Sequence, residues 1–385
     1  MKNKKTNSTS ASLKVAIIVG TRPEAIKMAP VYLALRDNPR VQVKLIATAQ
    51  HREMLDQALG VFGITSDIDL NIMQPNQSLQ QVSSKVILGV QKSLSELKPD
   101  AVLVHGDTTT CLCSALSAFY ERIPIGHVEA GLRTYNFAAP WPEEMNRRLV
   151  DPICRWCWTP TDRGADNLLS ERIPEENIFI TGNTVIDALF IARDIVHRCK
   201  PEISELPVEV LDGRRLILVT GHRRESFGEP FEEFCLALRQ LAEEHRDTVF
   251  VYPVHLNPNV QKPVRKILSK KDTIYLIPPI GYLPFVYLMD RSYFIITDSG
   301  GIQEEAPSLH KPVLVTRTMT ERPEAVEAGL AKLVGTSREK ILGEASRLLS
   351  DPEAYAKMSQ GHNPYGDGNA SKRIVNILMS TLQTE

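Results

Sequence analysis

Short apolar segments alternate with longer amphipathic stretches along most of the chain. In the first half the apolar segments lie at residues 15–19, 43–47, 101–104, 124–128 and 178–180; in the second half they lie at 216–219, 249–252, 274–277, 294–296 and 312–315. Continuous apolar runs of this length are typical of parallel strands whose two faces are both buried. The intervening stretches predict helices, in the first half at about 24–36, 51–60, 78–97, 108–121 and 161–171. The pattern therefore predicts an α/β fold.

The predicted strands fall into two groups, which we assign to two doubly wound, Rossmann-like domains. The N-terminal domain takes residues 13–185 together with 368–385, and the C-terminal domain takes 186–367. The 385 residues are enough for each domain to bury its own core. Residues 1–12, with lysines followed by Ser, Thr and Asn, are expected to form a disordered tail. Because ligands of open α/β sheets bind beyond the carboxyl ends of the strands, we expect the two domains to face a cleft.

Composition and charge narrow the range of partners. Lys and Arg number 45 against 46 Asp and Glu, which gives a formal net charge of -1. This balance disfavours a nucleic-acid binder or a protein that binds anionic membranes. No apolar run reaches the length of a membrane-spanning helix and no apolar signal segment begins the chain, so we expect a cytoplasmic protein. The histidines lack metal-ligand spacing, and the one close cysteine pair, Cys154 and Cys157, is interpreted as reduced, partly buried thiols.

The polar turn that follows the fourth predicted strand of the second half is a candidate phosphate site. Ser299, Gly300 and Gly301 stand where a helix begins, so free helix N–H groups and two glycines allow an anion to approach the backbone. An ordinary tight turn explains two glycines equally well. Glu304 and Glu305 follow in what we predict to be the first turn of this helix, where one of them is placed to accept hydrogen bonds from a ribose. A diphosphate beside a ribose indicates a nucleotide.

Three carboxylates follow predicted strands or a rigid turn in the first half of the chain. Asp107 either caps the helix that begins at Thr108 or takes part in chemistry. Glu129 ends a buried strand and needs a partner or a catalytic task, although a structural ion pair meets the same requirement. Glu143 follows a Trp-Pro dipeptide on a predicted rigid loop. Acids that gather in a cleft tend to have raised pKa values, which permits proton transfer near neutral pH.

Basic residues lie beside several of the same strand ends. Arg22 and Lys27 follow the first predicted strand and are able to reach an anion, although either alone fits a solvated helix terminus. In the second half His222 stands beside two arginines and a glycine, which suits a diphosphate, whereas His255 fits a hydrogen-bonded structural role. The glycine patterns of dinucleotide-binding and P-loop proteins are absent, which disfavours a dehydrogenase or a P-loop enzyme. Acids in one domain and anion ligands in the other predict a nucleotide-sugar enzyme, and a glycosyltransferase fits almost as well.

Seven longer motifs occur in one order along the chain. They are GTRPEAIKMAP at 20–30, TAQHREMLD at 48–56, HGDTTT at 105–110, HVEAGLRT at 127–134, GNTVID at 182–187, GHRRE at 221–225 and DSGGIQEEAP at 298–307. With these motifs the chain closely resembles the bacterial non-hydrolysing UDP-N-acetylglucosamine 2-epimerases. The likeness runs from about residue 14 to beyond residues 363–368.

This resemblance implies a glycosyltransferase-B-like fold and a reversible conversion of UDP-N-acetylglucosamine (UDP-GlcNAc) into UDP-N-acetylmannosamine (UDP-ManNAc), with no cofactor and no metal. In that family UDP leaves C1 as the C2 proton is removed, which gives 2-acetamidoglucal; UDP then adds back while C2 is reprotonated on the other face. Two faces need at least two proton-handling groups, which suits Asp107, Glu129 and Glu143. The resemblance also implies a homodimer and a supply of ManNAc for cell-surface polysaccharide.

Site residues are carried over by the same resemblance. Catalytic roles fall to Asp107, Glu129, Glu143 and His222. Substrate contacts fall to Arg22, Lys27, Asp107, Glu129, His222, Phe285, Ser299, Gly300, Gly301, Glu305 and Arg322, with Phe285 near the uracil. In relatives a second UDP-GlcNAc binds near the active site and activates the enzyme, and the corresponding residues here are Gln50, His51, Arg224 and His255. Three alternatives stay open: a hydrolysing relative that releases ManNAc and UDP, a glycosyltransferase, and a catalytically silent nucleotide-sugar-binding protein.

Overall fold

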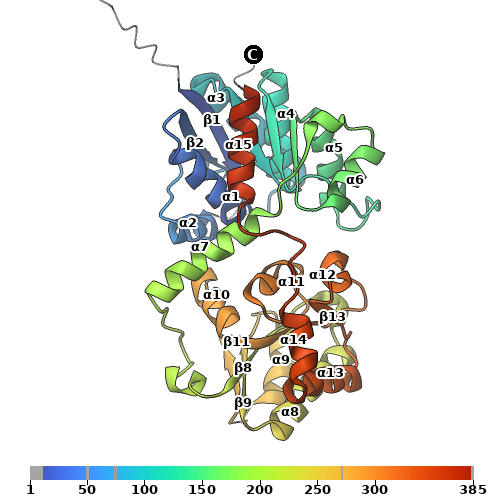
Figure 1. Cartoon of the computed structure of the whole chain (residues 1–385). Helices are drawn as coiled ribbons and strands as arrows, with labels where there is room; N and C mark the ends of the chain where they lie inside the picture. The colour runs from blue at the N-terminus through green and yellow to red at the C-terminus, as the bar shows by residue number, and fades with distance from the viewer. Residues whose placement is uncertain (1–11, 49–51, 73, 75, 270–271, 383–385) are drawn as a thin grey trace, which may run out of the picture. The chain divides into compact units, whose positions relative to one another are not determined.

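The computed structural model describes residues 12–48, 52–72, 74, 76–269 and 272–382 of the chain. Apart from residue 12, the predicted tail at 1–12 lies outside the described residues, and so do Gln50 and His51. The chain forms two compact units, one of Met1–Ala188 with Gly368–Glu385 and the other of Leu189–Asp367. In Figure 1 the red C-terminal helix α15 lies with the blue and cyan elements of the first unit.

Among the described residues, the first unit contains one sheet of seven parallel strands in the order β3-β2-β1-β4-β5-β6-β7. The strands are β1 (Leu13–Val19), β2 (Val41–Ala47), β3 (Ile68–Asp69), β4 (Ala101–His105), β5 (Ile125–Val128), β6 (Trp156–Thr159) and β7 (Ile178–Ile180). The five strands predicted for this half are confirmed. The sequence pattern does not predict β3, which has only two residues, or β6, whose four buried residues include two stacked tryptophans.

Helices connect these strands and cover the sheet. They are α1 (Arg22–Arg36), α2 (Arg52–Val61), α3 (Leu79–Leu97), α4 (Thr109–Tyr120), α5 (Glu143–Val150), α6 (Asp162–Ser170) and α15 (Ala370–Leu382), with 3₁₀ turns η1 (Asp151–Ile153) and η2 (Glu175–Asn177). The helix α7 (Thr184–Arg198) begins in this unit and continues into the second. The five helices predicted for this half are confirmed, with small shifts at their ends. The rigid loop predicted around Glu143 is wrong, because Glu143 begins α5.

The C-terminal helix α15 belongs to the first unit and packs against α1. Its first turn is fixed by Asp187 of α7, whose carboxylate accepts hydrogen bonds from the N–H groups of Ala370 and Ser371 at 3.1 and 2.8 Å. An acceptor at this place satisfies N–H groups that have no partner within the helix. Near its other end, Thr381 Oγ1 accepts a hydrogen bond from the Trp156 indole at 2.8 Å, so α15 is also tied to β6.

In the part of the chain that the structure describes, the second unit contains a sheet of six parallel strands in the order β10-β9-β8-β11-β12-β13. The strands are β8 (Arg215–Thr220), β9 (Thr248–Pro253), β10 (Ile274–Ile277), β11 (Ser292–Thr297), β12 (Val313–Val315) and β13 (Ala331–Leu333). The five strands predicted for this half are confirmed, and the short strand β13 is an addition.

The helices of the second unit alternate with its strands. They are α8 (Glu229–Glu244), α9 (Pro258–Leu268), α10 (Tyr282–Arg291), α11 (Gly300–Glu305), α12 (Pro323–Glu327), α13 (Arg338–Ser350) and α14 (Pro352–Ser359), with 3₁₀ turns η3 (Val208–Leu211), η4 (Arg224–Ser226) and η5 (Ala306–Leu309). The core of this unit includes Phe234, Phe250 and Phe294, all of them 2% exposed or less.

The two sheets share the Rossmann strand order, so the predicted α/β fold with two Rossmann-like sheets is confirmed. In each sheet the order reverses once: between β1 and β4 in the first unit, and between β8 and β11 in the second. Ligands of open α/β sheets bind at such switch points, beyond the carboxyl ends of the strands. The segments that follow β1, β4, β8 and β11 are therefore the places at which to look for a site.

Candidate active site

In the first unit, the segment after β1 approaches the neighbouring strand ends very closely. Gly20 lies against two threonines: a Cβ placed on it would be 2.2 Å from Thr110 Oγ1 and 2.5 Å from Thr48 Oγ1. These distances are far shorter than carbon–oxygen contact allows, so only glycine fits at this position without rearrangement. The absence of a side chain here lets the loops that begin α1 and α4 converge on the switch point.

These two loops are joined by the buried carboxylate of Glu24, which is 1% exposed. Its Oε2 accepts hydrogen bonds from the N–H groups of Gly20 and Thr21 at 3.0 and 2.7 Å, and its Oε1 accepts one from the Thr108 hydroxyl at 2.6 Å. Burial raises the pKa of Glu24, while the hydrogen bonds from Thr108 and Thr21 oppose that rise. Glu24 is missing from the residues singled out from the sequence, although its T-x-x-E spacing from Thr21 is the pattern of a capping box.

Asp107 follows β4 and faces a partly open space, since its side chain is 30% exposed. The helix after it is capped by Thr108, whose hydroxyl accepts a hydrogen bond from the Cys111 N–H at 3.0 Å. The alternative that Asp107 is the N-cap is therefore wrong. Its carboxylate pairs instead with Arg147, at 3.1 Å from Oδ2 to Nη2, and its carbonyl accepts a hydrogen bond from Asn146 at 2.8 Å. Asp107 is thus held by α5 and left accessible to a ligand.

Glu129 follows β5 with a backbone φ of +67°, a left-handed conformation that is unusual for a residue other than glycine. Its carboxylate is 8% exposed and pairs through Oε2 with Lys27 of α1. The His105 Nε2 atom lies 3.4 Å from the same oxygen. Lys27 is 14% exposed, so it is not the solvated side chain of a helix terminus. The structure thus joins two of the predicted site residues, Lys27 and Glu129, in one ion pair.

The other predicted residues of the first unit are Arg22 and Glu143, which begin α1 and α5 respectively. Both side chains are partly exposed. Among the described residues, the Glu143 carboxylate has no hydrogen-bond or ion-pair partner. The adjacent Glu144 is buried and accepts hydrogen bonds from the N–H groups of Thr134 and Tyr135 at 3.0 and 2.9 Å. Glu144 therefore fixes the preceding loop, while Glu143 stays available for a ligand.

A buried network of charges lies behind Glu129 and was not identified from the sequence. His127 Nδ1 lies 2.6 Å from Asp151 Oδ1, and its Nε2 lies 2.7 Å from the carbonyl oxygen of Gly106. Arg133 donates to Asp151 at 2.7 Å and to Glu171 at 2.8 and 3.0 Å. Both ring nitrogens of His127 therefore lie within hydrogen-bonding distance of an oxygen atom.

The charges of this network shift two pKa values. Burial alone raises the pKa of Asp151. His127 and Arg133 outweigh this effect through their charges and hydrogen bonds, and they hold the pKa below its ordinary value. Burial likewise lowers the pKa of Arg133, and Glu171 and Asp151 reverse this and raise it overall. Histidine and aspartate inside otherwise apolar segments are the pattern that could have revealed this network. The network links β5 to η1 through the contact between His127 and Asp151.

In the second unit, the switch point between β8 and β11 is organised by Asp298, which is 2% exposed. Its Oδ2 accepts hydrogen bonds from the N–H groups of His222 and Arg223, both at 2.7 Å. The His222 ring stacks on His255 with 5.3 Å between centroids and 11° between planes. Burial lowers the pKa of His222, and the charges of His255 and Arg223 lower it further. The charge of Asp298 raises this pKa but does not outweigh the other effects. The His222 side chain is nevertheless 43% exposed, so a ligand has access to it.

The turn after β11 has open space beside it. Ser299 precedes α11, and a Cβ placed on Gly300 or Gly301 would meet no atom within 4 Å. The expectation that Glu304 and Glu305 lie in the first turn is wrong, because α11 begins at Gly300 and has only six residues, which puts both acids at its far end. They are also buried, at 2% and 8% exposure.

Both acids have partners in the second unit. Glu304 pairs with Arg322, which precedes α12, and Glu305 Oε1 lies 3.5 Å from the Tyr282 hydroxyl of α10. Phe285 lies on α10 and is partly buried. The structure therefore gathers Glu304, Glu305 and Arg322 around α11.

Of the residues implied by the resemblance as a second nucleotide-sugar site, the structure describes Arg224 and His255. Arg224 begins the turn η4 and is exposed. His255 follows β9 and accepts a hydrogen bond through Nδ1 from the Asn257 N–H at 3.1 Å, which agrees with the structural role expected for it. Its stacking on His222 was not anticipated from the sequence.

Comparison with known proteins then decides the family. The family model described as UDP-N-acetylglucosamine 2-epimerase matches residues 33–379. The chain belongs to this family. It is 55% identical over 369 residues to the UDP-N-acetylglucosamine 2-epimerase of Escherichia coli K12, an alignment that covers 95% of this chain and 98% of the relative.

Solved structures of the family agree. The UDP-GlcNAc 2-epimerase of Neisseria meningitidis, bound to UDP-GlcNAc, shares 51% identity at a TM-score of 0.85 and covers 96% of this chain and 100% of that chain. The enzyme of Methanocaldococcus jannaschii, in complex with UDP-GlcNAc and UDP, shares 33% identity at a TM-score of 0.75, with coverage of 96% and 100%. A kitacinnamycin glycosyltransferase shares only 12% identity at a TM-score of 0.65, which shows likeness of fold alone.

Two further observations concern the described part of this epimerase-family chain. It contains no group of three or more His, Cys, Asp or Glu side chains placed to hold a metal ion. None of its described helices is both long enough and apolar enough to cross a membrane.

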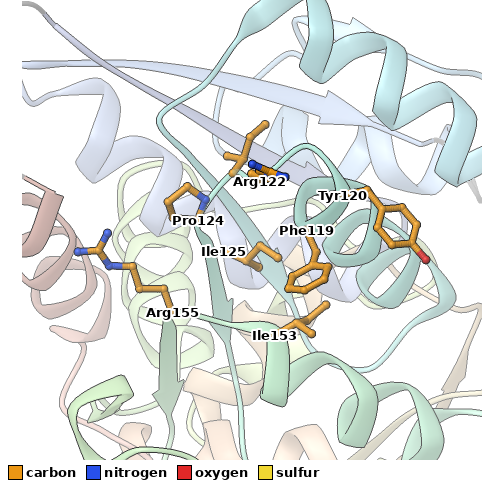
Figure 2. Close-up of a pocket in the computed structure, with 8 residues that line it drawn as sticks. Phe119, Tyr120, Arg122, Pro124, Ile125, Ile153 and Arg155 are labelled. Carbon is orange, nitrogen blue, oxygen red and sulfur yellow. The ribbon is translucent and has the colours of Figure 1, made fainter. Parts of the chain in front are cut away.

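A cavity of about 540 Å³ lies away from the carboxylates. It is lined by the end of α4, by Ile125 at the start of β5 and by Ile153, whereas Glu129 follows the other end of β5. Figure 2 shows the Phe119, Ile125 and Ile153 side chains grouped together there. The cavity therefore belongs to the amino-terminal edge of the sheet and not to the candidate active site.

Proposed function

We propose that this chain interconverts UDP-GlcNAc and UDP-ManNAc without hydrolysing them. The observation that carries the proposal is its likeness, over 95% of its length, to a protein named UDP-N-acetylglucosamine 2-epimerase. The three acids to which the family resemblance gives proton transfer, Asp107, Glu129 and Glu143, are all present in the first unit. A silent nucleotide-sugar-binding protein would not need them, whereas a glycosyltransferase is distinguished by its products.

The reaction that we propose proceeds by elimination and addition. A base takes the C2 proton, the C–H electron pair forms a C1=C2 double bond, and the C1–O bond breaks with its electrons leaving on UDP. The product is 2-acetamidoglucal. In the second step a UDP oxygen attacks C1, and C2 takes a proton on its other face. The atoms balance without an oxidant or a water, and a hydrolysing enzyme would differ only in the fate of the glucal and UDP.

We assign the proton transfers to the first unit. Asp107, Glu129 and Glu143 lie beyond strand ends or at a helix start, and Asp107 and Glu143 are partly exposed. Carboxylates act as bases when ionised and as acids when protonated, so two of them suffice for two faces of C2. Arg147 and Lys27 compensate the charges of Asp107 and Glu129.

We assign the nucleotide to the second unit. The N–H groups of Gly300 and Gly301, the Ser299 hydroxyl and the Arg322 guanidinium suit a diphosphate, because each is a donor and the glycines leave space beside them. Glu305 suits the ribose hydroxyls, and the partly buried ring of Phe285 suits the uracil. The lowered pKa of His222 favours its neutral imidazole, which is able to donate a hydrogen bond to UDP as it departs. Arg22, which belongs to the first unit, stays a predicted substrate contact.

We retain the proposal of a second, activating UDP-GlcNAc because His255 stacks directly on His222. A ligand that contacts His255 and Arg224 would thereby act on a residue of the nucleotide site. Sigmoidal rate dependence on UDP-GlcNAc, and a lag when the reaction starts from pure UDP-ManNAc, are the expected results. Hyperbolic kinetics without a lag would remove this part of the proposal. A homodimer, a cytoplasmic location and a supply of ManNAc for polysaccharide stay predictions.

The test combines product analysis with variants of two acids. Purified protein incubated with UDP-GlcNAc should give UDP-ManNAc and no free ManNAc on anion-exchange chromatography. Asp107→Asn and Glu129→Gln should each lower the rate by about 10² to 10⁴-fold, the range typical of a lost acid or base. UDP binding measured by calorimetry should persist in both.

Asp37→Asn serves as the control, because its side chain is 69% exposed and its one ion pair among the described residues is with the neighbouring exposed Arg36. It should keep full activity. Free ManNAc as the product would favour the hydrolysing branch. Normal turnover in both acid variants would show that the acids are wrongly assigned.

A further inference from the structure

His105, the last residue of β4, has an unexplained environment. Its side chain is 4% exposed, and neither ring nitrogen has a hydrogen-bond partner among the residues that the structure describes. A buried polar atom without a partner costs about 1–3 kcal/mol, so such atoms are rare unless another role retains them. The motif HGDTTT contains His105, but neither the family likeness nor the proposed roles give it a task.

Two carboxylates lie near His105, and Lys27 approaches one of them, Glu129, as well. Its Nε2 atom lies 3.4 Å from Glu129 Oε2. Glu24 is a second buried carboxylate that interacts electrostatically with the imidazole. The strand register explains this placement, because His105 of β4 pairs with Val128 of β5, the residue immediately before Glu129. The sheet itself therefore sets the imidazole beside the Glu129 carboxylate.

Two of the contacts of Glu129 meet at one of its oxygens. Lys27 and His105 both approach Oε2, from α1 and from β4 respectively. Two contacts on one oxygen restrict rotation about the last bond of the side chain. The left-handed backbone at Glu129 restricts its starting direction as well. A carboxylate that exchanges a proton with a carbon atom needs this restriction, because a displacement of about 1 Å costs about 10²-fold in rate.

We propose that His105 is a positioning residue, which holds the Glu129 carboxylate at Oε2 for proton transfer at C2 of the nucleotide sugar. This inference rests on the proposed function. An imidazole with a proton on Nε2 presents an N–H group toward Oε2, 3.4 Å away, and unlike lysine or arginine it carries no permanent charge. A second fixed cation beside Lys27 would instead stabilise the carboxylate further and oppose its protonation. Histidine therefore suits a carboxylate that has to be ionised at one step and protonated at another.

The first test compares two substitutions that retain different parts of the imidazole. The amide nitrogen of Gln reaches the position of Nε2, whereas that of Asn reaches the position of Nδ1. His105→Asn should lower kcat by about 10²-fold, with KM for UDP-GlcNAc and Kd for UDP both within about twofold of wild type, since ground-state binding is unaffected. His105→Gln should restore most of kcat.

Ser114→Ala is the matched control for the loss of a buried, unpartnered polar group in the same unit. Ser114 of α4 is 0% exposed and its hydroxyl has no partner among the described residues. This variant should keep wild-type kcat and thermal stability. If His105→Asn lost UDP binding and folding stability together while His105→Gln did the same, a structural role would replace the positioning role.

The second test is a double-mutant cycle with Glu129→Gln. If His105 acts through Glu129, His105→Asn should lower kcat no further in the Glu129→Gln background. A full additional loss in that background, or normal kcat for His105→Asn in the wild-type background, would overturn the inference while leaving the epimerase proposal intact. If the wild-type protein itself forms no UDP-ManNAc, the proposed function fails first, so the two failures are distinguishable.

Discussion

Asp151→Asn should destabilise the first unit strongly, because the buried side chains of Arg133 and His127 share the Asp151 carboxylate. The carboxylate is 0% exposed and lies 2.6 Å from His127 Nδ1 and 2.7 Å from Arg133 Nη2. Removing one partner of a buried ion pair costs about 3–5 kcal/mol. Arg133 keeps Glu171 and His127 keeps the Gly106 carbonyl, so we expect the lower end, about 3 kcal/mol at pH 7.

The tryptophans provide a selective assay for this loss. The chain has 3 Trp residues, Trp141, Trp156 and Trp158, and all of them belong to the first unit. Tryptophan fluorescence during urea or thermal unfolding therefore reports on that unit. A loss of about 3 kcal/mol corresponds to a fall in Tm of roughly 6–12 °C for a unit of this size. Asp37→Asn, at an exposed site in the same unit, should change the free energy of unfolding by no more than about 0.5 kcal/mol.

The pH dependence of the loss follows from the pKa of Asp151, which is lower in the folded state than its ordinary value. A lowered carboxyl pKa contributes stability above the unfolded pKa of about 3.9. That contribution is lost as the pH falls from there through the folded pKa. The difference between wild type and Asp151→Asn should thus be constant at neutral pH and shrink below pH of about 4. A difference under about 1 kcal/mol at pH 7 would refute the description of this network as a shared buried charge.

Three further predictions use other parts of the structure. Gly20→Ala should destabilise the first unit by about 1–3 kcal/mol, because the added Cβ clashes with Thr110 and Thr48. Gly60→Ala is the control: a Cβ there meets nothing within 4 Å, so this variant should be neutral or stabilising in the same fluorescence assay. Arg322→Met should weaken UDP binding by about 10 to 10²-fold in calorimetry, as expected for one lost charge-assisted contact. Arg239→Ala, which removes an exposed ion pair, should leave UDP binding unchanged. Equal UDP affinities of Arg322→Met and wild type would place the diphosphate elsewhere. Of the cysteines, only Cys199 is exposed, and burial raises the pKa of Cys111 and Cys154, so a thiol reagent should modify one cysteine rapidly and none in Cys199→Ser.

Much of the fold could be predicted because the buried parallel strands are continuous apolar runs. The pattern failed where an element carried too few such residues: β3 has two residues, and β6 is aromatic and lies close to charged and polar neighbours. The helix α5 was predicted as a loop because a Trp-Pro dipeptide precedes Glu143, yet proline is compatible with a helix start. Local composition therefore indicates the sheets better than the short connecting elements.

The candidate site was only partly predictable, since its geometry depends on contacts between distant residues. Residues at strand ends, such as Asp107 and Glu129, could be chosen because parallel strands bring their carboxyl ends together. Lys27 could be chosen in the same way, but the pairing of these acids could not, because Arg147 lies 40 residues beyond Asp107 in the sequence and Lys27 lies 102 residues before Glu129. The wrong placement of Glu304 in a first helical turn arose from the helix start, which α11 sets at Gly300.

The most direct test of the proposed reaction is proton NMR of the purified protein with UDP-GlcNAc in heavy water. Proton removal from one face of C2 and delivery to the other should place deuterium from the solvent at C2 of the UDP-ManNAc that forms. The C2 proton signal of the product should accordingly be absent. The anomeric proton signal should remain that of a sugar still linked to UDP. Free ManNAc with UDP, or UDP-ManNAc that retains the original C2 proton, would contradict this account.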